Sequence, residues 1–324
     1  MISHSRIVGL GAYTPPKIMT NDDFEKIVDT SDEWILQRTG IHERHICSEE
    51  EFSSDLAIGA VENLVDVTGA SLDEVDLIIV TTFTPDYLAP HVASVVQGYF
   101  GIPHTGTFDL GAGCTGFTYA LSVADALITS GQNKKILVVA AEAVSKTVDY
   151  SDRTSCILFG DAGAACLLEY TEDEGAFLAC RFHTDGDLAH HVTCSNFSQT
   201  INGETITNKA TFDQNGQQVY KYVMQHIPTG VEELVAKAGI AFDEIDWFIP
   251  HSANMRMIQT ICNKLNFPEE KTLTSLEQYG NTSSVSIPLA LWIAQQEGRL
   301  QKGDILALYG FGAGLTHGGV VVRF

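Results

Sequence analysis

Short apolar runs, each bounded by polar turn residues, recur along the chain and predict buried β-strands. Three of them are Leu77–Val80, Ile136–Ala141 and Ile305–Tyr309. Between such runs, amphipathic patterns at Ser54–Gly69 and Val219–Gly239 predict helices. Strands that alternate with helices are typical of α/β proteins, in which helices cover the faces of a sheet. None of the runs reaches the roughly 18 residues that a membrane-spanning helix needs.

An internal repeat organises these elements. The segment Leu72–Ile79, an acidic turn followed by a strand, reappears as Phe242–Ile249, and each copy follows an amphipathic helix. Further along, a loop leads into a helical pattern at Cys114 in the first copy and at Asn281 in the second. Two copies of one order of elements predict a duplicated α/β fold with two pseudo-symmetric halves.

We place the boundary between the halves near residue 170, after the predicted strand Ala164–Glu169. This gives an N-terminal half, 1–170, and a C-terminal half, 171–324. The segment 183–217 is polar and shows no regular period. Two interpretations stay open for it: a disordered insertion, or a lid or wall of a site, because long loops in compact domains often serve such roles.

Composition narrows the classes of function. The chain carries 19 lysines and arginines against 41 aspartates and glutamates, and this net charge of −22 disfavours nucleic-acid binding. Its seven cysteines form no C-x-x-C pair and no cluster with zinc-ligand spacing, so we expect no metal site and reduced thiols. The first residues lack the pattern of a signal peptide. We therefore expect a soluble, cytoplasmic protein that binds neither nucleic acid nor membrane.

Cys114 is the strongest candidate for chemistry. It lies among glycines, where a predicted strand ends and the helical stretch Thr115–Ser130 begins. The free amides and the dipole of a helix N-terminus stabilise a thiolate, which a nucleophilic cysteine needs. The alternative is a buried structural cysteine, because a free thiol often behaves as a small core residue.

His251 and Asn281 gain significance from the repeat. His251 follows the predicted strand Asp246–Pro250, at the end of a strand where α/β folds bind ligands, although a single histidine is usually an ordinary core or surface residue. Asn281 is most simply a turn or helix N-cap residue. Because Cys114 and Asn281 occupy equivalent junctions and His251 follows the repeated strand, pseudo-symmetry can bring all three into one crevice.

Six segments, taken in order, resemble one enzyme family. They are Asp29–Arg44, the cysteine loop Phe108–Leu121, Phe159–Ala165, His251–Arg256, Tyr279–Ser283 and Gly310–Thr316. They are similar to the motifs of beta-ketoacyl-acyl-carrier-protein synthase III, the initiating condensing enzyme of type II fatty acid synthesis. The similarity spans nearly the whole chain. It implies a thiolase-like α/β fold, layered αβαβα.

The resemblance also implies a catalytic triad of Cys114, His251 and Asn281. Cys114 would take an acyl group from acyl-CoA, and the backbone amides of Cys114 and Ala313 would stabilise the oxyanion. His251 and Asn281 would donate hydrogen bonds to the thioester oxygen of malonyl-acyl-carrier protein and stabilise the enolate formed on loss of CO2. This role requires a neutral His251, which burial favours. No cofactor is implied, since the CoA thioester is a substrate.

Two groups of residues would contact the substrates by the same resemblance. Trp34 and Arg153 would enclose the CoA adenine, and their flat side chains suit that role. The other residues expected to bind CoA are Arg38, Gly216 and Asn254. The residues expected to contact the carrier protein are Ser252, Ala253, Asn254, Met255 and Arg256, together with Lys221 and Lys264. Such a local basic patch would let a strongly acidic protein bind an acidic carrier.

Some positions depart from the family pattern. Ser252, Ala313 and His317 stand where Gln, Gly and Trp are common. Where some members have an aromatic residue at the floor of the acyl pocket, this chain has Ala89, within Tyr87–Pro90. We therefore expect it to accept acetyl-CoA and short branched acyl-CoA primers. Family members form homodimers, and Ala89 would lie near that interface.

Alternatives to this function remain open. One is a relative that transfers acyl groups to another acceptor without malonyl decarboxylation, which the presence of His251 and Asn281 disfavours. Another is a condensing enzyme of secondary metabolism. The last is a non-catalytic, carrier-binding homologue with a degenerate site, which the presence of Cys114 disfavours.

Overall fold

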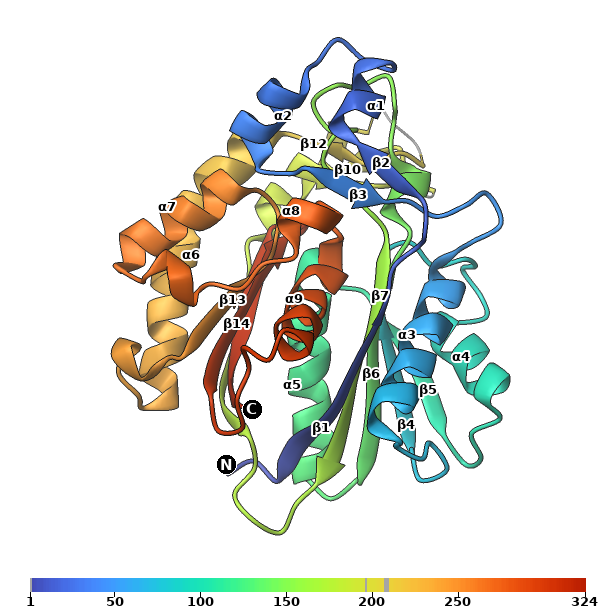
Figure 1. Ribbon diagram of the computed structural model, residues 1–324, viewed down its shortest axis with the longest axis vertical. Coiled ribbons are helices and arrows are strands. Elements are labelled where there is room, and N and C mark those ends of the chain that lie inside the picture. The colour runs from blue at the N-terminus through green and yellow to red at the C-terminus, as the bar shows by residue number, and fades with distance from the viewer. Residues whose placement is uncertain (1, 196, 207–209) are drawn as a thin grey trace.

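The computed structural model describes residues 2–195, 197–206 and 210–324, and two β-sheets form its centre (Figure 1). The first sheet has the strand order β1-β7-β6-β4-β5, and the second has the order β13-β14-β15-β8. The strands of the first sheet are β1 (Ser5–Tyr13), β4 (Leu77–Thr81), β5 (Gly106–Leu110), β6 (Lys135–Glu142) and β7 (Ala162–Tyr170). Those of the second are β8 (Phe177–Thr184), β13 (Trp247–Pro250), β14 (Ile305–Gly312) and β15 (Thr316–Arg323).

The two sheets repeat one pattern of pairing. In the first, β4 and β6 are parallel, whereas β6 with β7 and β7 with β1 are antiparallel. In the second, β13 and β14 are parallel, whereas β14 with β15 and β15 with β8 are antiparallel. β5 extends the first sheet in parallel to β4, and a parallel bridge between Phe248 and Thr272 extends β13 in the same sense. The duplicated α/β fold expected from the sequence is confirmed.

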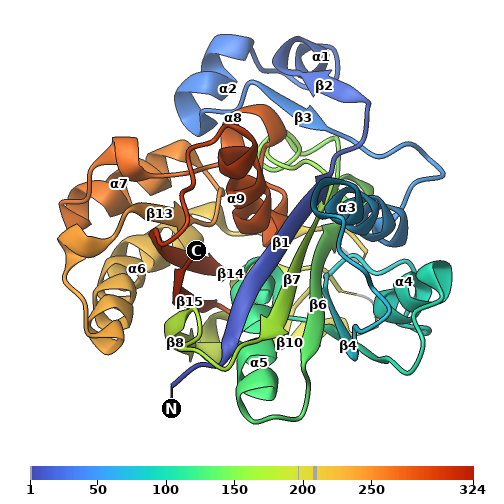
Figure 2. The same ribbon diagram turned by 60° about the horizontal axis from the view of Figure 1, so that its bottom comes forward.

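Helices complete the order αβαβα. α3 (Ser53–Thr68) and α4 (Val92–Phe100) pack on the outer face of the first sheet, and α6 (Gly216–Ala238) and α7 (Met255–Leu265) on that of the second. α5 (Gly116–Thr129) and α9 (Ser286–Gln296) lie between the sheets, as both views show (Figure 1, Figure 2). α5 contacts β6 and β15, and α9 contacts β1 and β14, so each of these helices packs against both sheets.

The apolar core follows from this enclosure. The five consecutive residues 287–291 of α9 are buried, because a helix covered on both sides must be apolar all round. Every residue of β4 and of β6 is buried as well, which explains why these strands appear in the sequence as continuous apolar runs. One core cluster includes side chains from both sheets and from both middle helices.

Shorter elements cover the end of the sheets where the middle helices begin (Figure 1). They are β2 (Ile18–Thr20), α1 (Asn21–Glu25), α2 (Asp32–Thr39), β3 (Glu43–His45) and α8 (Leu276–Tyr279), with β9 (Val192–Thr193), β10 (Thr200–Ile201), β11 (Glu204–Thr205) and β12 (Asp213–Gln214) from the polar segment 183–217. Within the described ranges, no helix has the length and apolar character needed to span a bilayer.

Candidate active site

A cavity of about 560 Å³ lies where the two halves meet, and its lining includes Cys114, His251 and Asn281. Cys114 belongs to the turn that leads into α5, His251 follows β13 directly, and Asn281 lies between α8 and α9. Cys114 is half-buried, and the other two are buried. The three side chains expected to form a triad are therefore brought to one cavity from equivalent places in the two halves.

Cys114 fits against β14 because the facing residue is a glycine. A Cβ atom at Gly312 would lie 2.8 Å from the Cβ of Cys114 and 3.1 Å from its Sγ, so any larger residue would displace the thiol. The next residue, Ala313, also lines the cavity, and its backbone nitrogen lies 3.9 Å from the position of a Cβ built on Gly113. The amides of Cys114 and Ala313, expected to bind the oxyanion, thus belong to neighbouring segments.

The thiol of Cys114 is protonated at neutral pH. Burial raises its pKa to about 12, and this outweighs the opposing effects of the hydrogen bond with Ser283 and of a backbone amide. In the free site, burial thus has a larger effect on this pKa than the hydrogen bonds that favour the thiolate. A step that uses Cys114 as a nucleophile needs a group to accept its proton.

His251 is held as a neutral imidazole. Burial lowers its pKa to about 3, which confirms the expected neutral state. Its Nδ1 lies 2.7 Å from the Oγ of Ser286, and that oxygen already accepts a hydrogen bond from the backbone N–H of Ser252. The Ser286 hydroxyl hydrogen is thus free to be donated to Nδ1, which leaves Nε2 as the protonated nitrogen. His251 can then donate a hydrogen bond from Nε2.

Asn281 is oriented by the backbone. Its N–H donates to the carbonyl of Leu158, and its own carbonyl accepts from the N–H of Gly160. Its side-chain Oδ1 accepts a hydrogen bond of 2.9 Å from the N–H of Ser283. Since the amide oxygen is engaged, the Nδ2 hydrogens are the groups that Asn281 can offer to a ligand. Two neutral donors, His251 and Asn281, therefore line the same cavity as the thiol.

The residues expected to bind CoA form one region of this site. Trp34, Arg38, Gly216 and Asn254 line the cavity, and Arg153 packs beside them. The guanidinium carbons of Arg38 and Arg153 lie 5.6 Å and 5.3 Å from the centre of the Trp34 ring. The side chain of Asn254 donates to the carbonyl of Arg38. A flat indole flanked by two cations suits a nucleotide with phosphate groups.

The residues expected to contact a carrier protein differ in how far they are exposed to solvent. Arg256, Lys221 and Lys264 are exposed, and Arg256 also lines the cavity. Ala253, Asn254 and Met255 are partly buried. Ser252 is fully buried and accepts a hydrogen bond from the N–H of Ser275, so its assignment to the carrier-protein surface is wrong.

Ala89 does not reach the acyl pocket within its own chain. Among the described residues of this chain, Ala89 is not one that lines the cavity; it is exposed, as are Tyr87 and Leu88. The cavity is instead lined near its catalytic end by Phe83, Phe159 and Phe212. The ring centres of Phe212 and Phe159 are 4.8 Å apart, and those of Phe212 and Phe83 are 6.1 Å apart.

Phe212 comes from the polar segment 183–217. Val192, Thr193, Cys194 and Gln214 of the same segment line the cavity too, so its interpretation as a wall of the site is confirmed. Sequence reasoning missed this aromatic wall. A signal was present, because Phe212 is an isolated large apolar residue in a polar stretch.

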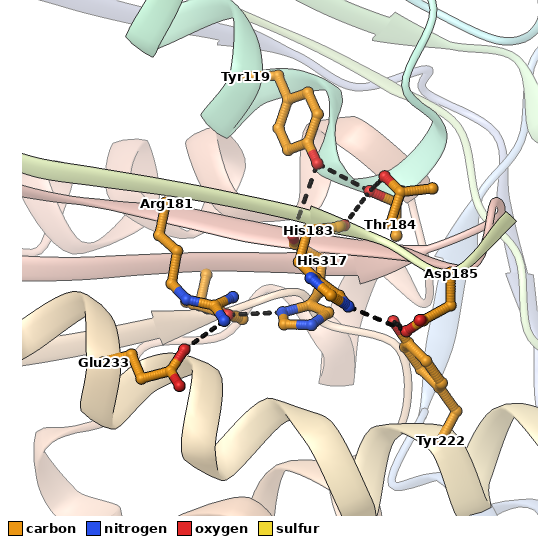
Figure 3. A network of polar contacts seen from close by, with 10 residues as sticks. Tyr119, Arg181, His183, Thr184, Asp185, Tyr222, Glu233 and His317 are labelled. Carbon is orange, nitrogen blue, oxygen red and sulfur yellow. Dashed lines mark hydrogen bonds and ion pairs between the residues drawn. The ribbon is translucent and has the colours of Figure 1, made fainter.

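A polar network fixes the start of this wall to the second sheet (Figure 3). Asp185 accepts hydrogen bonds from the hydroxyl of Tyr222, at 2.8 Å, and from His183, at 3.2 Å. Nearby, the Tyr309 hydroxyl lies 2.7 Å from Nδ1 of His317. α6 comes this close because it has a glycine here: a Cβ at Gly230 would lie 2.9 Å from the His317 ring.

The buried histidines predict a loss of stability in mild acid. Burial lowers the pKa of His317 to about 4 and that of His251 to about 3, from 6.5. Below pH 6.5 the unfolded chain binds protons at these positions and the folded chain does not. The free energy of unfolding should therefore fall by about 1.4 kcal/mol per pH unit and histidine as the pH drops from 6.5 towards 4.

Urea unfolding at pH 7 and pH 5 tests this expectation. His317→Gln keeps a polar side chain near Tyr309 but cannot titrate. Its loss of unfolding free energy between the two pH values should be smaller than that of the unchanged chain by about 2 kcal/mol. Equal losses in both proteins would contradict the assignment of a neutral, buried His317.

Comparisons with known proteins agree on one family. Residues 108–186 match the family model described as 3-Oxoacyl-[acyl-carrier-protein (ACP)] synthase III, and residues 235–324 match the one described as its C terminal part. The chain is 53% identical to a protein of Bacillus anthracis named Beta-ketoacyl-[acyl-carrier-protein] synthase III 2, over 100% of this chain and 99% of that protein. A protein of the same name from Bacillus subtilis is 50% identical, with the same coverage of both chains.

Solved structures agree as well. The crystal structure of beta-ketoacyl-acyl-carrier-protein synthase III from Thermus thermophilus superposes with a TM-score of 0.95 at 41% identity, over 98% of this chain and 99% of that one. The corresponding enzyme from Aquifex aeolicus gives a TM-score of 0.92 at 39% identity, over 99% of this chain and 100% of that one. By its sequence motifs, its fold and these full-length matches, the chain belongs to the beta-ketoacyl-acyl-carrier-protein synthase III family.

Proposed function

We propose that the chain catalyses the decarboxylative condensation of an acyl-CoA primer with malonyl-acyl-carrier protein, the initiating step of fatty acid synthesis. The products are a 3-oxoacyl-acyl-carrier protein, CoA and CO2. One observation carries the proposal: a thiol, a neutral histidine and an asparagine amide, Cys114, His251 and Asn281, line the same cavity. This reaction needs a nucleophile that carries the acyl group and hydrogen-bond donors that stabilise the enolate.

In the first half-reaction, the sulfur of Cys114 attacks the carbonyl carbon of the acyl-CoA. The backbone amides of Cys114 and Ala313 stabilise the tetrahedral oxyanion, and CoA leaves as a thiol once it has gained the proton of Cys114. In the second, the malonyl thioester loses CO2, and its carbonyl oxygen becomes an enolate that His251 and Asn281 stabilise by hydrogen bonds. The enolate carbon attacks the acyl group, the new carbon–carbon bond forms, and the thiolate of Cys114 is released and takes up a proton from solvent.

The substrates would enter through the region around Trp34. The aromatic ring between Arg38 and Arg153 suits the adenine and phosphates of CoA, and Gly216 and Asn254 suit the pantetheine arm. Arg256 lies exposed at the beginning of α7, where it suits an acidic carrier protein, with Lys221 and Lys264 beyond it. We further propose that the enzyme is a cytoplasmic homodimer that needs no cofactor and binds neither nucleic acid nor membrane.

The test is a coupled measurement of acylation, CO2 release and product. Purified chain is incubated with malonyl-acyl-carrier protein and one acyl-CoA. Acetyl-, isobutyryl- and hexanoyl-CoA are used in separate reactions. We expect CO2 and a 3-oxoacyl carrier protein in equal amounts. Acyl transfer without CO2 release would instead support the acyl-transferring relative, and a chain that neither accepts acyl groups nor releases CO2 would support the non-catalytic homologue.

Primer size is expected to depend on the aromatic wall. Phe212→Ala removes a ring that packs on Phe83 and Phe159, and it enlarges the cavity. One methylene in an apolar pocket changes the transition-state free energy by roughly 1–3 kcal/mol. The ratio of kcat/KM for hexanoyl-CoA over acetyl-CoA should therefore rise by about tenfold or more. An unchanged ratio would show that the wall does not limit the primer.

Ala89→Phe is the matched comparison, because residue 89 lies outside the cavity lining of its own chain. The short branched primers expected from Ala89 depend on a second subunit that brings this residue to the pocket. In a homodimer, the added ring should lower kcat/KM for isobutyryl-CoA relative to acetyl-CoA. An unchanged preference would show that residue 89 does not contribute to the acyl pocket.

A further inference from the structure

Glu142, the last residue of β6, is a fully buried carboxyl group that the triad leaves without a role. None of the ion pairs found among the described residues involves it. Its oxygens instead accept hydrogen bonds from neutral groups: Thr82 Oγ1, Phe83 N and Thr84 Oγ1 at Oε2, and Ser283 Oγ and Ser284 Oγ at Oε1. A carboxyl group without a counter-charge is costly to bury, so its presence asks for an explanation.

A single hydroxyl group connects this carboxyl to the nucleophile. The Oγ of Ser283 donates to Oε1 of Glu142 at 3.1 Å and lies 3.5 Å from the Sγ of Cys114. An ionised carboxylate can only accept, so the hydroxyl hydrogen is directed to Glu142 when that group is charged, and the protonated thiol of Cys114 can then donate its S–H to the same hydroxyl oxygen. The order is therefore thiol, hydroxyl, carboxylate, which is the order along which a proton can move.

The backbone holds Ser283 firmly in this position. Its φ angle is +52°, in the left-handed region of the backbone that residues other than Gly, Asn and Asp rarely adopt. Its N–H donates to Oδ1 of Asn281, and its side chain is buried. Ser283 thus contacts both Cys114 and Asn281, and the geometry of the whole site depends on it.

The protonation states complete the argument. The buried thiol of Cys114 has a pKa near 12, and His251, with a pKa near 3, is too weak a base to hold its proton at neutral pH. Burial raises the pKa of Glu142 to about 7, despite its hydrogen bonds. A group that titrates near the working pH is the best suited to take up a proton and give it back.

Near Glu142, the structure describes few titratable groups. Among the described residues, the turn before α5 brings one titratable group towards it, the thiol of Cys114. The stretches after β4 and before α9 contribute the hydroxyl groups and the amide named above. A pH dependence of the thiol chemistry near neutrality therefore points to Glu142.

We propose that Glu142 is a positioning residue that accepts the proton of Cys114 through Ser283 during acylation. As the sulfur bonds to the carbonyl carbon of acyl-CoA, the thiol proton passes to Ser283 Oγ and the Ser283 proton passes to Glu142 Oε1. When the carbon–sulfur bond to CoA breaks, Glu142 Oε1 returns its proton to Ser283 Oγ, and Ser283 Oγ gives its own proton to the departing CoA sulfur. The carboxylate is restored, and no other reactant is needed. The inference rests on the proposed function, since it supplies a step of that reaction.

The experiment follows a single turnover of acylation. Each protein is mixed with excess acetyl-CoA between pH 6 and pH 9, quenched after set times, and the acetyl group on Cys114 is measured by mass spectrometry. The unchanged chain should acylate faster as the pH rises to about 7 and then reach a plateau, because Glu142 must be ionised to accept a proton. Glu142→Gln should acylate about 10²–10⁴-fold more slowly, the range typical of a lost general base, and its rate should keep rising tenfold per pH unit.

Two serine variants separate proton transfer from structural support. Ser283→Ala breaks the path but keeps the carboxyl group, and it should behave like Glu142→Gln. Ser284→Ala removes a shorter hydrogen bond, 2.7 Å, to the same carboxylate oxygen without interrupting the path. A plateau should therefore remain, at a higher pH, because the lost bond lowers the pKa of Glu142. Thermal unfolding of each variant verifies that it is folded.

The outcomes are distinct. An unchanged plateau in Glu142→Gln or Ser283→Ala, or acylation within about threefold of the unchanged chain, would overturn the role of Glu142. Loss of the plateau in Ser284→Ala together with Ser283→Ala would overturn the path through Ser283. A failure of the unchanged chain to acylate at all would instead reject the proposed function itself.

Discussion

Replacement of Cys114 by alanine is expected to abolish the transfer of an acyl group from acyl-CoA to the chain. The sulfur of Cys114 faces the cavity beside Gly312 and at the start of α5, where the amides that stabilise an oxyanion are available. Intact-mass measurement after incubation with acetyl-CoA should show one added acetyl group on the unchanged chain and none on the variant.

The structure supplies the matched control for this experiment. Cys194 also lines the cavity and is exposed, so it is the second thiol that an acyl-CoA could meet. Cys194→Ala should still gain one acetyl group, because this residue comes from the wall segment and has no place in the triad. An acetylated Cys114→Ala protein would reject the assignment of the nucleophile.

Loss of either enolate donor should separate the two half-reactions. In His251→Ala and Asn281→Ala, Cys114 should still accept an acetyl group, while release of CO2 from malonyl-acyl-carrier protein falls by about 10²–10³, the usual cost of a lost oxyanion donor. The reason is geometric: Ser286 orients the His251 ring, and Ser283 engages the oxygen of Asn281, so both donors are fixed before the substrate arrives.

CO2 release is measured with labelled malonyl-acyl-carrier protein. His91→Ala, which removes an exposed imidazole outside the cavity lining, is the control and should release CO2 at the unchanged rate. A His251 or Asn281 variant that decarboxylates as fast as the control would show that this residue does not stabilise the enolate.

The strands of the sheets were the easiest features to predict from the sequence. β4, β6 and β14 are enclosed by helices on both faces, so they appear as uninterrupted apolar runs. The repeat then predicts the pairing, because Leu72–Ile79 and Phe242–Ile249 lead into strands with the same neighbours in the two sheets. The edge elements β2, β3 and β9 to β12 are short and polar, and no periodic pattern predicts them.

The parts of the site that depend on the order of helices and strands could be predicted from the sequence. The parts that depend on how deeply a side chain is buried could not. Cys114, His251 and Asn281 follow from the ends of strands and the starts of helices. The high pKa of Cys114 does not, because it results from desolvation, which local sequence does not indicate. The burial of Ser252, the exposure of Ala89 and the hydrogen bonds of Glu142 result from contacts between residues far apart in the chain.

The two middle helices have a consequence for synthesis on the ribosome. When residues 1–170 have emerged, all five strands of the first sheet are available to pair, yet α9, which covers β1 and β7, has not been made. The face of α5 that meets β14 and β15 is also uncovered. The nascent chain therefore carries a large apolar surface until its last strands are translated, and we expect it to be prone to aggregation during that interval.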